Sequence, residues 1–302
     1  MDYAGTIKPM SDYNFAIKPE AYGLPSRENL VDMRIWDLHY HGLSSHAEIM
    51  PYFDRMGVER VFSLDIARLR GGGGTVSAAE AEKNAQENIA LLEKEHERMS
   101  GIIRIDPTRV EETLELIDRL IANGPCVGIK TGRPLDEPVT VAHPNYDPII
   151  RRLAELEAII YIHSGYMVGG EPRTYYGGTR VGEAHPGHVA ELAARFPDVP
   201  LICGHQGTDW ELGVRAIRPH KNVLMEFSGM DPASGAVDFA VKELGADRLV
   251  WGCHAPTRSF ANELSNVYDS DMSRSQRKMI LGGNLRRISA SIHRRKGIPV
   301  DI

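Results

Sequence analysis

Two histidines, His39 and His41, are separated by one residue at the end of an apolar segment, residues 35–38, that predicts a β-strand. Side chains two positions apart on a strand point to the same face, so both imidazoles project together where the strand gives way to Gly42. Imidazole is the commonest side-chain ligand for zinc and similar metals. The pair therefore predicts half of a metal site, although two unrelated surface histidines would show the same spacing.

Seven more short apolar runs follow this strand, and each of them ends in polar residues. Near-continuous apolar runs of this length are typical of strands buried on both faces, as in a parallel sheet. The runs cover residues 61–64, 101–105, 127–130, 159–163, 201–205, 223–227 and 249–252.

Helical patterns with start signals lie between these runs. Residues 77–80 and 108–111 fit the capping box, and two Asp-Pro pairs, at 147–148 and 231–232, place an N-cap acid before a proline at the first helical position. A doubly wound open sheet would also alternate strands with helices, but a count of eight strands with polar ends favours a (β/α)8 TIM barrel. We expect an irregular N-terminal arm over residues 1–30 and the barrel over residues 31–302.

Further polar residues end the predicted strands on the side where His39 and His41 lie. Lys130 ends the fourth strand, His163 the fifth and His205 the sixth, and His254 follows the eighth. Barrel enzymes place their chemistry at the carboxyl ends of the strands. Any one of these histidines could be a satisfied core residue, but their common placement favours a metal-dependent active site. Lys130 is expected to contact substrate there, unless it forms a structural ion pair with an acid at the rim.

Several segments carry a likeness to a known family. They cover residues 37–41, 160–165, 192–198, 202–207, 226–229 and 280–288. In this order and spacing the chain resembles the second amidohydrolase group, relatives of aminocarboxymuconate-semialdehyde decarboxylase and of the resorcylate-type decarboxylases. The resemblance implies that His39, His41 and His163 bind a metal, and that His205 is the catalytic histidine beside the metal-bound water.

The chain departs from the family pattern at the eighth strand. The family motif there is usually Gly-Ser-Asp followed by a proline two residues on, whereas this chain reads Gly252-Cys-His-Ala-Pro256. A neutral imidazole from His254 can still donate a lone pair to a metal, but the anionic proton acceptor is lost. Either His254 ligates the metal while His205 acts as the base, or the site has lost its metal or its activity. We expect the first, with His254 both a ligand and a catalytic residue.

The longest insertion at the rim follows the fifth strand and covers residues 165–188. Long loops in a compact domain are often lids or binding loops. We expect Arg173, Tyr175 and Arg180 of this loop to contact a substrate carboxylate, because the planar guanidinium pairs with both carboxylate oxygens. The alternative for these residues is a solvated surface loop.

Composition predicts a soluble, cytoplasmic enzyme that acts on a small molecule. The chain has 302 residues and a net charge of −6, which gives no reason to expect nucleic acid or an anionic membrane as partner. No apolar stretch is long enough to span a membrane. The three cysteines, Cys126, Cys203 and Cys253, are expected to be reduced, with Cys253 filling the place of the family's serine. The N-terminal arm could wrap the barrel or a second copy in a homo-oligomer.

The first functional expectation is hydrolysis of a small, carboxylated lactone, amide or ester by one divalent metal, zinc in the first place and manganese or iron as alternatives. His205 would move the proton of the attacking water. The alternative is nonoxidative decarboxylation of a small hydroxy-carboxylate, for which the lost aspartate is the greater handicap because that acid is expected to protonate carbon. A third possibility is a barrel kept for binding or scaffolding.

Overall fold

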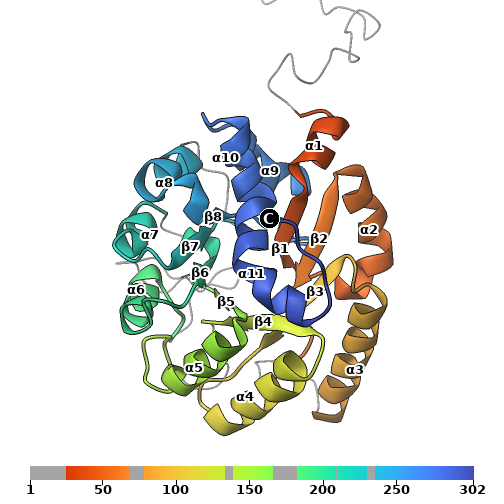
Figure 1. Cartoon of the computed structure of the whole chain (residues 1–302), viewed down its shortest axis with the longest axis vertical. Helices are drawn as coiled ribbons and strands as arrows, with labels where there is room; N and C mark the ends of the chain where they lie inside the picture. The colour runs from red at the N-terminus through yellow and green to blue at the C-terminus, as the bar shows by residue number, and fades with distance from the viewer. Residues whose placement is uncertain (1–24, 69–77, 133–138, 166–181, 208–209, 230–234) are drawn as a thin grey trace, which may run out of the picture.

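Eight parallel strands form one sheet in the order β1 to β8, so that each strand pairs with its neighbours in the sequence (Figure 1). The structure is a computed structural model, and it describes residues 25–68, 78–132, 139–165, 182–207, 210–229 and 235–302. The strands are β1 (Ile35–Tyr40), β2 (Val58–Ser63), β3 (Met99–Arg104), β4 (Cys126–Thr131), β5 (Ile159–Ile162), β6 (Leu201–Cys203), β7 (Val223–Glu226) and β8 (Leu249–Val250).

The chain segment after β8 closes the sheet into a barrel. The Leu38 N–H donates to the Trp251 carbonyl at 3.2 Å, and the His41 N–H donates to the Ala255 carbonyl at 2.8 Å. A parallel bridge between Tyr40 and Ala255 continues this contact. The predicted (β/α)8 TIM barrel is therefore confirmed, and each predicted strand is present with shifted ends.

Helices surround the barrel, and they lie before the first strand, between successive strands and after the last strand (Figure 1). They are α1 (Arg27–Met33), α2 (His46–Arg55), α3 (Ala78–Lys94), α4 (Val110–Ile117), α5 (Tyr146–Leu156), α6 (Pro186–Arg195), α7 (Trp210–Ile217), α8 (Ala236–Leu244), α9 (Phe260–Tyr268), α10 (Arg274–Lys278) and α11 (Asn284–Arg295). Short 3-10 turns cover Leu43–Ser45, Gly204–Gly207 and Ala246–Arg248, and π-helical turns cover Asp118–Ala122 and Met279–Gly283.

Helix α11 crosses the amino-terminal ends of the strands (Figure 1). The Asn284 amide donates to the Leu249 carbonyl at 2.7 Å, at the start of β8. The Arg286 guanidinium donates to the Arg34 carbonyl at 2.6 Å, just before β1. Because this end of the barrel is covered, the polar strand ends at the opposite rim are the place where ligands can enter.

Two of the predicted helix starts are wrong. Helix α4 begins at Val110 without a side-chain cap, because the Thr108 hydroxyl donates to Asp106 Oδ1 at 2.7 Å instead of capping the helix. Helix α5 begins before Asp147, which lies in the first turn and pairs with Arg195 at 3.1 Å. The other two expected starts involve Ser77 and residues 231–232, which lie outside the described residues.

The described chain begins with helix α1, which crosses the boundary that we expected at residue 30. The Ser26 hydroxyl caps this helix by accepting a hydrogen bond from the Asn29 N–H at 3.2 Å. Leu30 and Met33 are buried in the barrel core. The remainder of the expected N-terminal arm lies outside the described residues. Within the described part of the chain, no helix is long and apolar enough to cross a membrane.

Candidate metal centre

His39 and His41 project together from the carboxyl end of β1, as their spacing predicts. Their Nε2 atoms lie 3.0 Å apart. The His39 Nδ1 turns inward to the Tyr161 hydroxyl at 3.1 Å and to Glu226 Oε1 at 3.4 Å, whereas the His41 Nδ1 contacts the Asp65 carboxylate. A carboxylate at Nδ1 holds the proton on that nitrogen, so that both Nε2 lone pairs face the same point.

Lys130 brings a positive charge to the same point. Its Nζ lies 3.3 Å from Nε2 of His39 and 3.3 Å from Nε2 of His41. The side chain is buried and comes from the end of β4. Two imidazole lone pairs that face each other at this distance repel, and the ammonium beside both of them reduces this repulsion.

His254 joins the pair from the segment after β8. Its ring stacks on the His39 ring with centroids 4.2 Å apart and an interplanar angle of 19°. The His254 Nδ1 contacts the Thr257 hydroxyl at 2.6 Å, which leaves Nε2 for the cluster. Burial, followed by the nearby His41 and Lys130, lowers the pKa of His254 to about 3, so its ring is neutral near neutral pH.

Gly229 provides the space into which His254 and His205 pack. A Cβ at this position would lie 2.4 Å from Cδ2 of His254 and 3.0 Å from Nδ1 of His205. Its φ of +74° is also a conformation that side chains disfavour. The chain therefore needs glycine after β7 for two imidazoles to share this part of the rim.

His205 lies in the 3-10 turn after β6, at the centre of the histidines. Its Nδ1 donates to the Ser228 carbonyl at 2.6 Å, so Nε2 carries the lone pair. Its ring centroid is 4.8 Å from that of His39 and 4.7 Å from that of His163. Burial, followed by the charge of His163, holds the pKa of His205 well below its ordinary value. This placement suits a group that exchanges a proton with a bound molecule.

His163 follows β5, and its ring packs against that of His205. Its Nε2 contacts Glu183 Oε1 at 2.7 Å. Ligation of a metal through this nitrogen requires that the contact with Glu183 be given up. The role of His163 as a metal ligand stays a prediction.

Glu226 is the residue of this site that sequence reasoning missed most clearly. Its Oε2 accepts hydrogen bonds from the Tyr161 hydroxyl at 3.1 Å and from the His205 N–H at 3.0 Å, and its Oε1 accepts one from the Ser228 N–H at 3.0 Å. Burial raises the pKa of this fully enclosed carboxyl group. Glu226 is the last residue of β7, so the strand-end rule that selected the histidines could have found it.

Asp65 is a second missed acid, placed just after β2. Burial opposes its ionisation, but the hydrogen bond and charge of His41, with Lys130 and Arg104, lower its pKa overall. The Arg104 guanidinium lies 3.6 Å from its Oδ1. Asp65 therefore stays charged and orients the His41 ring.

Asp37 ties the end of β8 to β1 beneath the histidines. Its Oδ1 accepts hydrogen bonds from the N–H groups of His39 and Cys253, and the Cys253 thiol donates to its Oδ2 at 2.7 Å. Burial, followed by the charge of Asp37, raises the pKa of Cys253 well above its ordinary value. The thiol is thus a buried hydrogen-bond donor, in agreement with a structural role in place of a serine.

The expected substrate contacts are only partly placed by the structure. Lys130 lies at the cluster itself. Arg173, Tyr175 and Arg180 lie outside the described residues, so their role stays a prediction.

The amidohydrolase family model (Amidohydro_2) matches residues 36–288. The chain belongs to the amidohydrolase family. The resemblance seen in the sequence is thereby confirmed, and this family member carries His254 at the eighth strand. No curated protein matches its sequence at a significant level.

Several solved structures share the fold of this amidohydrolase-family protein. A 2,6-dihydroxybenzoate decarboxylase from Rhizobium has a TM-score of 0.62 and 16% identity, over 85% of this chain and 98% of that one. A 5-carboxyvanillate decarboxylase from Novosphingobium aromaticivorans, complexed with manganese, has a TM-score of 0.62 and 20% identity, over 80% and 79%. A dihydroxybenzoic acid decarboxylase from a Polaromonas species with bound manganese has a TM-score of 0.61 and 17% identity, over 85% and 95%.

The histidines of this amidohydrolase-family protein fit a divalent metal ion. One ligand atom from each of His39, His41 and His254 lies within 4.8 Å of the others. Two nitrogens bound to one ion at about 2.0–2.1 Å can lie at most about 4.2 Å apart, so the set needs only a small contraction. The Lys130 ammonium has to move aside for the ion to enter.

A second group of potential ligands shares His39 with the first. It consists of His39, His205 and Glu226, and their ligand atoms also lie within 4.8 Å of one another. Glu226 already accepts several hydrogen bonds, and the His39 Nδ1 faces it while Nε2 faces His41. The group that contains His41 and His254 therefore offers the more accessible set of lone pairs.

Proposed function

We propose that this protein is a metal-dependent, nonoxidative decarboxylase of a small hydroxy-carboxylate. Hydrolysis of a carboxylated lactone, amide or ester was the first expectation from the sequence. The similar solved structures named above are decarboxylases of aromatic hydroxy acids, and they favour the alternative. The geometry supports this alternative through the charge around the potential metal ligands.

The observation that carries the proposal is the charge of the ligand face, by which we mean the side of the cluster where His39, His41 and His254 present their free nitrogens. The imidazoles of His39, His41 and His254 are neutral donors, and the Lys130 ammonium adds a positive charge beside two of them. Within the described residues, the acids that contact these rings do so at nitrogens that point away from the cluster, as Asp65 does at His41 Nδ1.

A divalent ion in this cluster keeps its full charge, because no ligand carboxylate neutralises it. The complementary molecule is one with a carboxylate and a neighbouring hydroxyl that can bind the ion together, with Lys130 beside them. The bound ion would polarise this pair and withdraw electrons from the bond that breaks. Such a substrate belongs to the hydroxy-carboxylates that the proposal names.

His205 supplies the proton in the proposed reaction. The bond between the carboxylate carbon and the adjacent carbon breaks, carbon dioxide leaves, and the electron pair remains on the adjacent carbon. The His205 Nε2 lone pair first takes the proton of the substrate hydroxyl and then passes it to that carbon, and water returns a proton to the hydroxyl oxygen. The Nδ1 contact with the Ser228 carbonyl fixes the ring orientation throughout, so that Nε2 faces the cluster.

We propose one divalent ion per chain and test its identity together with the reaction. Imidazole donors suit zinc, whereas manganese is the ion in two of the similar structures. The purified protein is freed of metal, reloaded with zinc, manganese or iron, and incubated with 2,6-dihydroxybenzoate, 5-carboxyvanillate and a panel of lactones and aryl esters.

The expected result is release of carbon dioxide from a hydroxybenzoate, dependent on metal and absent in His205→Gln. Ring opening of lactones or cleavage of esters without carbon dioxide would instead establish the hydrolase. A protein that holds its metal but converts none of these compounds would contradict both enzyme assignments and favour a binding role.

A further inference from the structure

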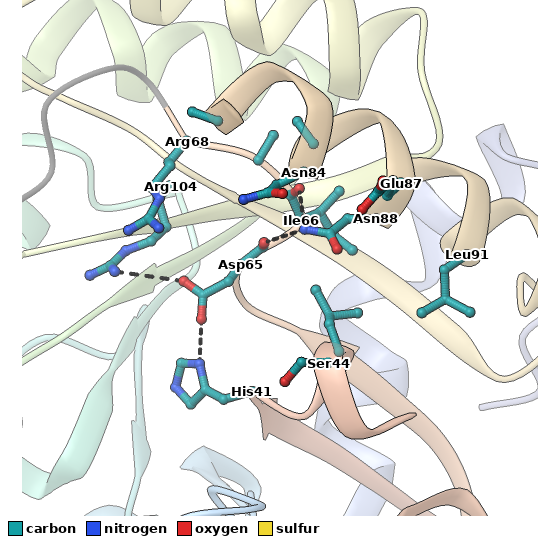
Figure 2. A pocket seen from close by; sticks show the side chains of 14 residues that line it. His41, Ser44, Asp65, Ile66, Arg68, Asn84, Glu87, Asn88, Leu91 and Arg104 are labelled. Carbon is teal, nitrogen blue, oxygen red and sulfur yellow. Dashed lines mark hydrogen bonds and ion pairs between the residues drawn. The ribbon is translucent and has the colours of Figure 1, made fainter. Parts of the chain in front are cut away.

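The imidazole rings of the site are oriented at Nδ1 in two different ways. For His41 the partner is a side chain, the Asp65 carboxylate, which contacts Nδ1 directly (Figure 2). For His205 the partner is the backbone, because Nδ1 donates to the Ser228 carbonyl at 2.6 Å. The orientation of the His205 ring therefore depends on how one peptide group is held.

This peptide group joins Ser228 to Gly229, and Glu263 of helix α9 binds its other end. The Gly229 N–H donates to Oε1 of Glu263 at 3.2 Å, and the Glu263 side chain is fully buried. The C=O and N–H of a trans peptide point in opposite directions in one plane. His205 and Glu263 therefore bind the same group from opposite sides.

The two neighbouring peptide groups are held independently of Glu263. The Ser228 N–H donates to Oε1 of Glu226 at 3.0 Å, and the Gly229 carbonyl accepts a hydrogen bond from the Arg258 guanidinium at 3.3 Å. Among the described residues, Glu263 is the side chain that fixes the N–H of the peptide between them.

Gly229 makes this middle peptide easy to turn over. Its φ is +74°, and glycine adopts positive and negative φ with similar ease, so rotation here meets little steric resistance. A peptide turned over would direct the Gly229 N–H, instead of the Ser228 carbonyl, to Nδ1 of His205. A neutral imidazole that accepts a hydrogen bond at Nδ1 carries its proton on Nε2, so the lone pair that faces the cluster would be lost.

Glu263 holds the peptide as a neutral hydrogen-bond acceptor. Burial, followed by the charge of Glu226, raises the pKa of Glu263 to about 8, so the group is mostly protonated near neutral pH. Its carbonyl oxygen still accepts a hydrogen bond from the Gly229 N–H. A glutamine at this position offers an oxygen of the same reach, whereas a methionine fills the space without one.

We propose that Glu263 is a positioning residue that fixes the Ser228–Gly229 peptide and thereby keeps the proton of the neutral His205 ring on Nδ1. The catalytic consequence rests on the proposed decarboxylase function, in which the Nε2 lone pair of His205 takes the proton of the substrate hydroxyl. The position of the proton on the ring is a property of the protein without substrate, so it can be measured separately from turnover.

The first test is nitrogen NMR of the full-length, zinc-loaded protein labelled at its histidines, at pH 7.5. The chemical shifts of Nδ1 and Nε2 report which nitrogen carries the proton, and the His205 signals are those missing from His205→Gln. The wild type and Glu263→Gln are expected to carry the His205 proton on Nδ1. Glu263→Met is expected to move a large part of it to Nε2.

The second test is turnover in the decarboxylation assay. Glu263→Met should lower kcat about tenfold, the effect of one hydrogen bond that no longer favours the active orientation. KM should stay near the wild-type value, because the groups that contact the substrate are unchanged. Glu263→Gln should keep the wild-type kcat.

Leu264→Ala is the matched control, because Leu264 is the next buried residue of helix α9 and its apolar side chain cannot bind a peptide N–H. It should lower the midpoint of urea unfolding and leave the His205 proton on Nδ1. A wild-type proton position in Glu263→Met, or the same shift in Leu264→Ala, would overturn the proposal. If Glu263→Met does not fold, Glu263→Asp, whose carboxyl group is one carbon shorter, takes its place with the same expected shift.

The two proposals fail in different ways. A shift of the His205 proton in Glu263→Met, without release of carbon dioxide from any hydroxy-acid by the wild type, would uphold the positioning role and refute the decarboxylase. Release of carbon dioxide by the wild type, with the proton position and kcat unchanged in Glu263→Met, would do the reverse.

Discussion

The Nε2 atoms of His39 and His41 face each other at 3.0 Å at the carboxyl end of β1. Each ring has an acid at its Nδ1, Glu226 for His39 and Asp65 for His41, which keeps the proton away from the shared side. Two lone pairs held this close repel each other, so a positive charge beside them is favoured.

Loss of a metal ligand should release the ion. We expect His41→Ala to reduce the metal content from one ion per chain to a small fraction, because a ligand from the facing pair is removed. His163→Ala should have the same effect if His163 gives up Glu183 to bind the ion. Metal content after gel filtration measures both, with His96→Ala as an exposed histidine control. Retention of a full ion in His163→Ala would exclude His163 from the ligands.

His205 should be needed for turnover and dispensable for the metal. We expect His205→Gln to lower kcat by about 10²–10⁴-fold, the usual contribution of a positioned proton donor. The Gln side chain keeps similar bulk against Gly229, so the metal content should stay near that of the wild type. Loss of metal together with activity would assign His205 to the ligands instead.

His254 should respond differently to two replacements. His254→Ala is expected to weaken metal binding, because it removes a ring that stacks on His39 and directs Nε2 to the cluster. His254→Asp restores the acid that the family usually has, and we expect it to retain the metal with turnover unchanged or raised. Metal affinity and turnover of both variants test this. A His254→Ala protein with wild-type metal affinity would contradict the ligand role.

Asp65 should act on the metal through His41. Asp65→Asn removes the charge that orients the ring, and loss of such a partner commonly costs about 10–100-fold in metal affinity. A competition titration with a chromogenic chelator measures this affinity. Asp54→Asn serves as the control, because Asp54 also pairs with an arginine but lies in helix α2, away from the cluster. An equal affinity in both variants would refute the orienting role.

The sequence was sufficient to predict the barrel and most of its rim. Apolar runs of strand length mark every strand, and His39, Lys130 and His254 all lie together at the carboxyl ends, where the barrel topology puts them. The ends of elements were less predictable. Thr108 matched a capping box, but its hydroxyl donates a hydrogen bond to Asp106, two residues earlier, and does not cap the helix.

The acids were missed because their partners are distant in the sequence. Glu226 accepts hydrogen bonds from Tyr161 of β5 and from His205 in the turn after β6, and Asp65 follows β2 without any pattern around it. A single sequence shows which residues end strands, but not which nitrogens they face. The orientation of each imidazole follows from three-dimensional contacts between neighbouring strands.

His293 makes the stability of the metal-free protein depend on pH. This buried residue of α11 contacts the Ser100 hydroxyl at 2.8 Å and the Ser289 carbonyl at 2.9 Å. Burial lowers its pKa to about 4, from an ordinary value of 6.5. Below pH 6.5 the unfolded chain therefore binds a proton that the folded chain does not, and stability falls until the pH reaches about 4.

The full shift corresponds to roughly 3 kcal/mol of unfolding free energy lost across that range. Urea unfolding of the metal-free protein at pH 7.5, 6.5, 5.5 and 4.5 measures it. We expect His293→Gln to be less stable than the wild type at pH 7.5, because its packing is disturbed, but to lose less stability as the pH falls. Other buried histidines contribute equally to both proteins, and exposed His96→Gln should follow the wild-type slope. Parallel curves for the wild type and His293→Gln would show that His293 is not the source of the pH dependence.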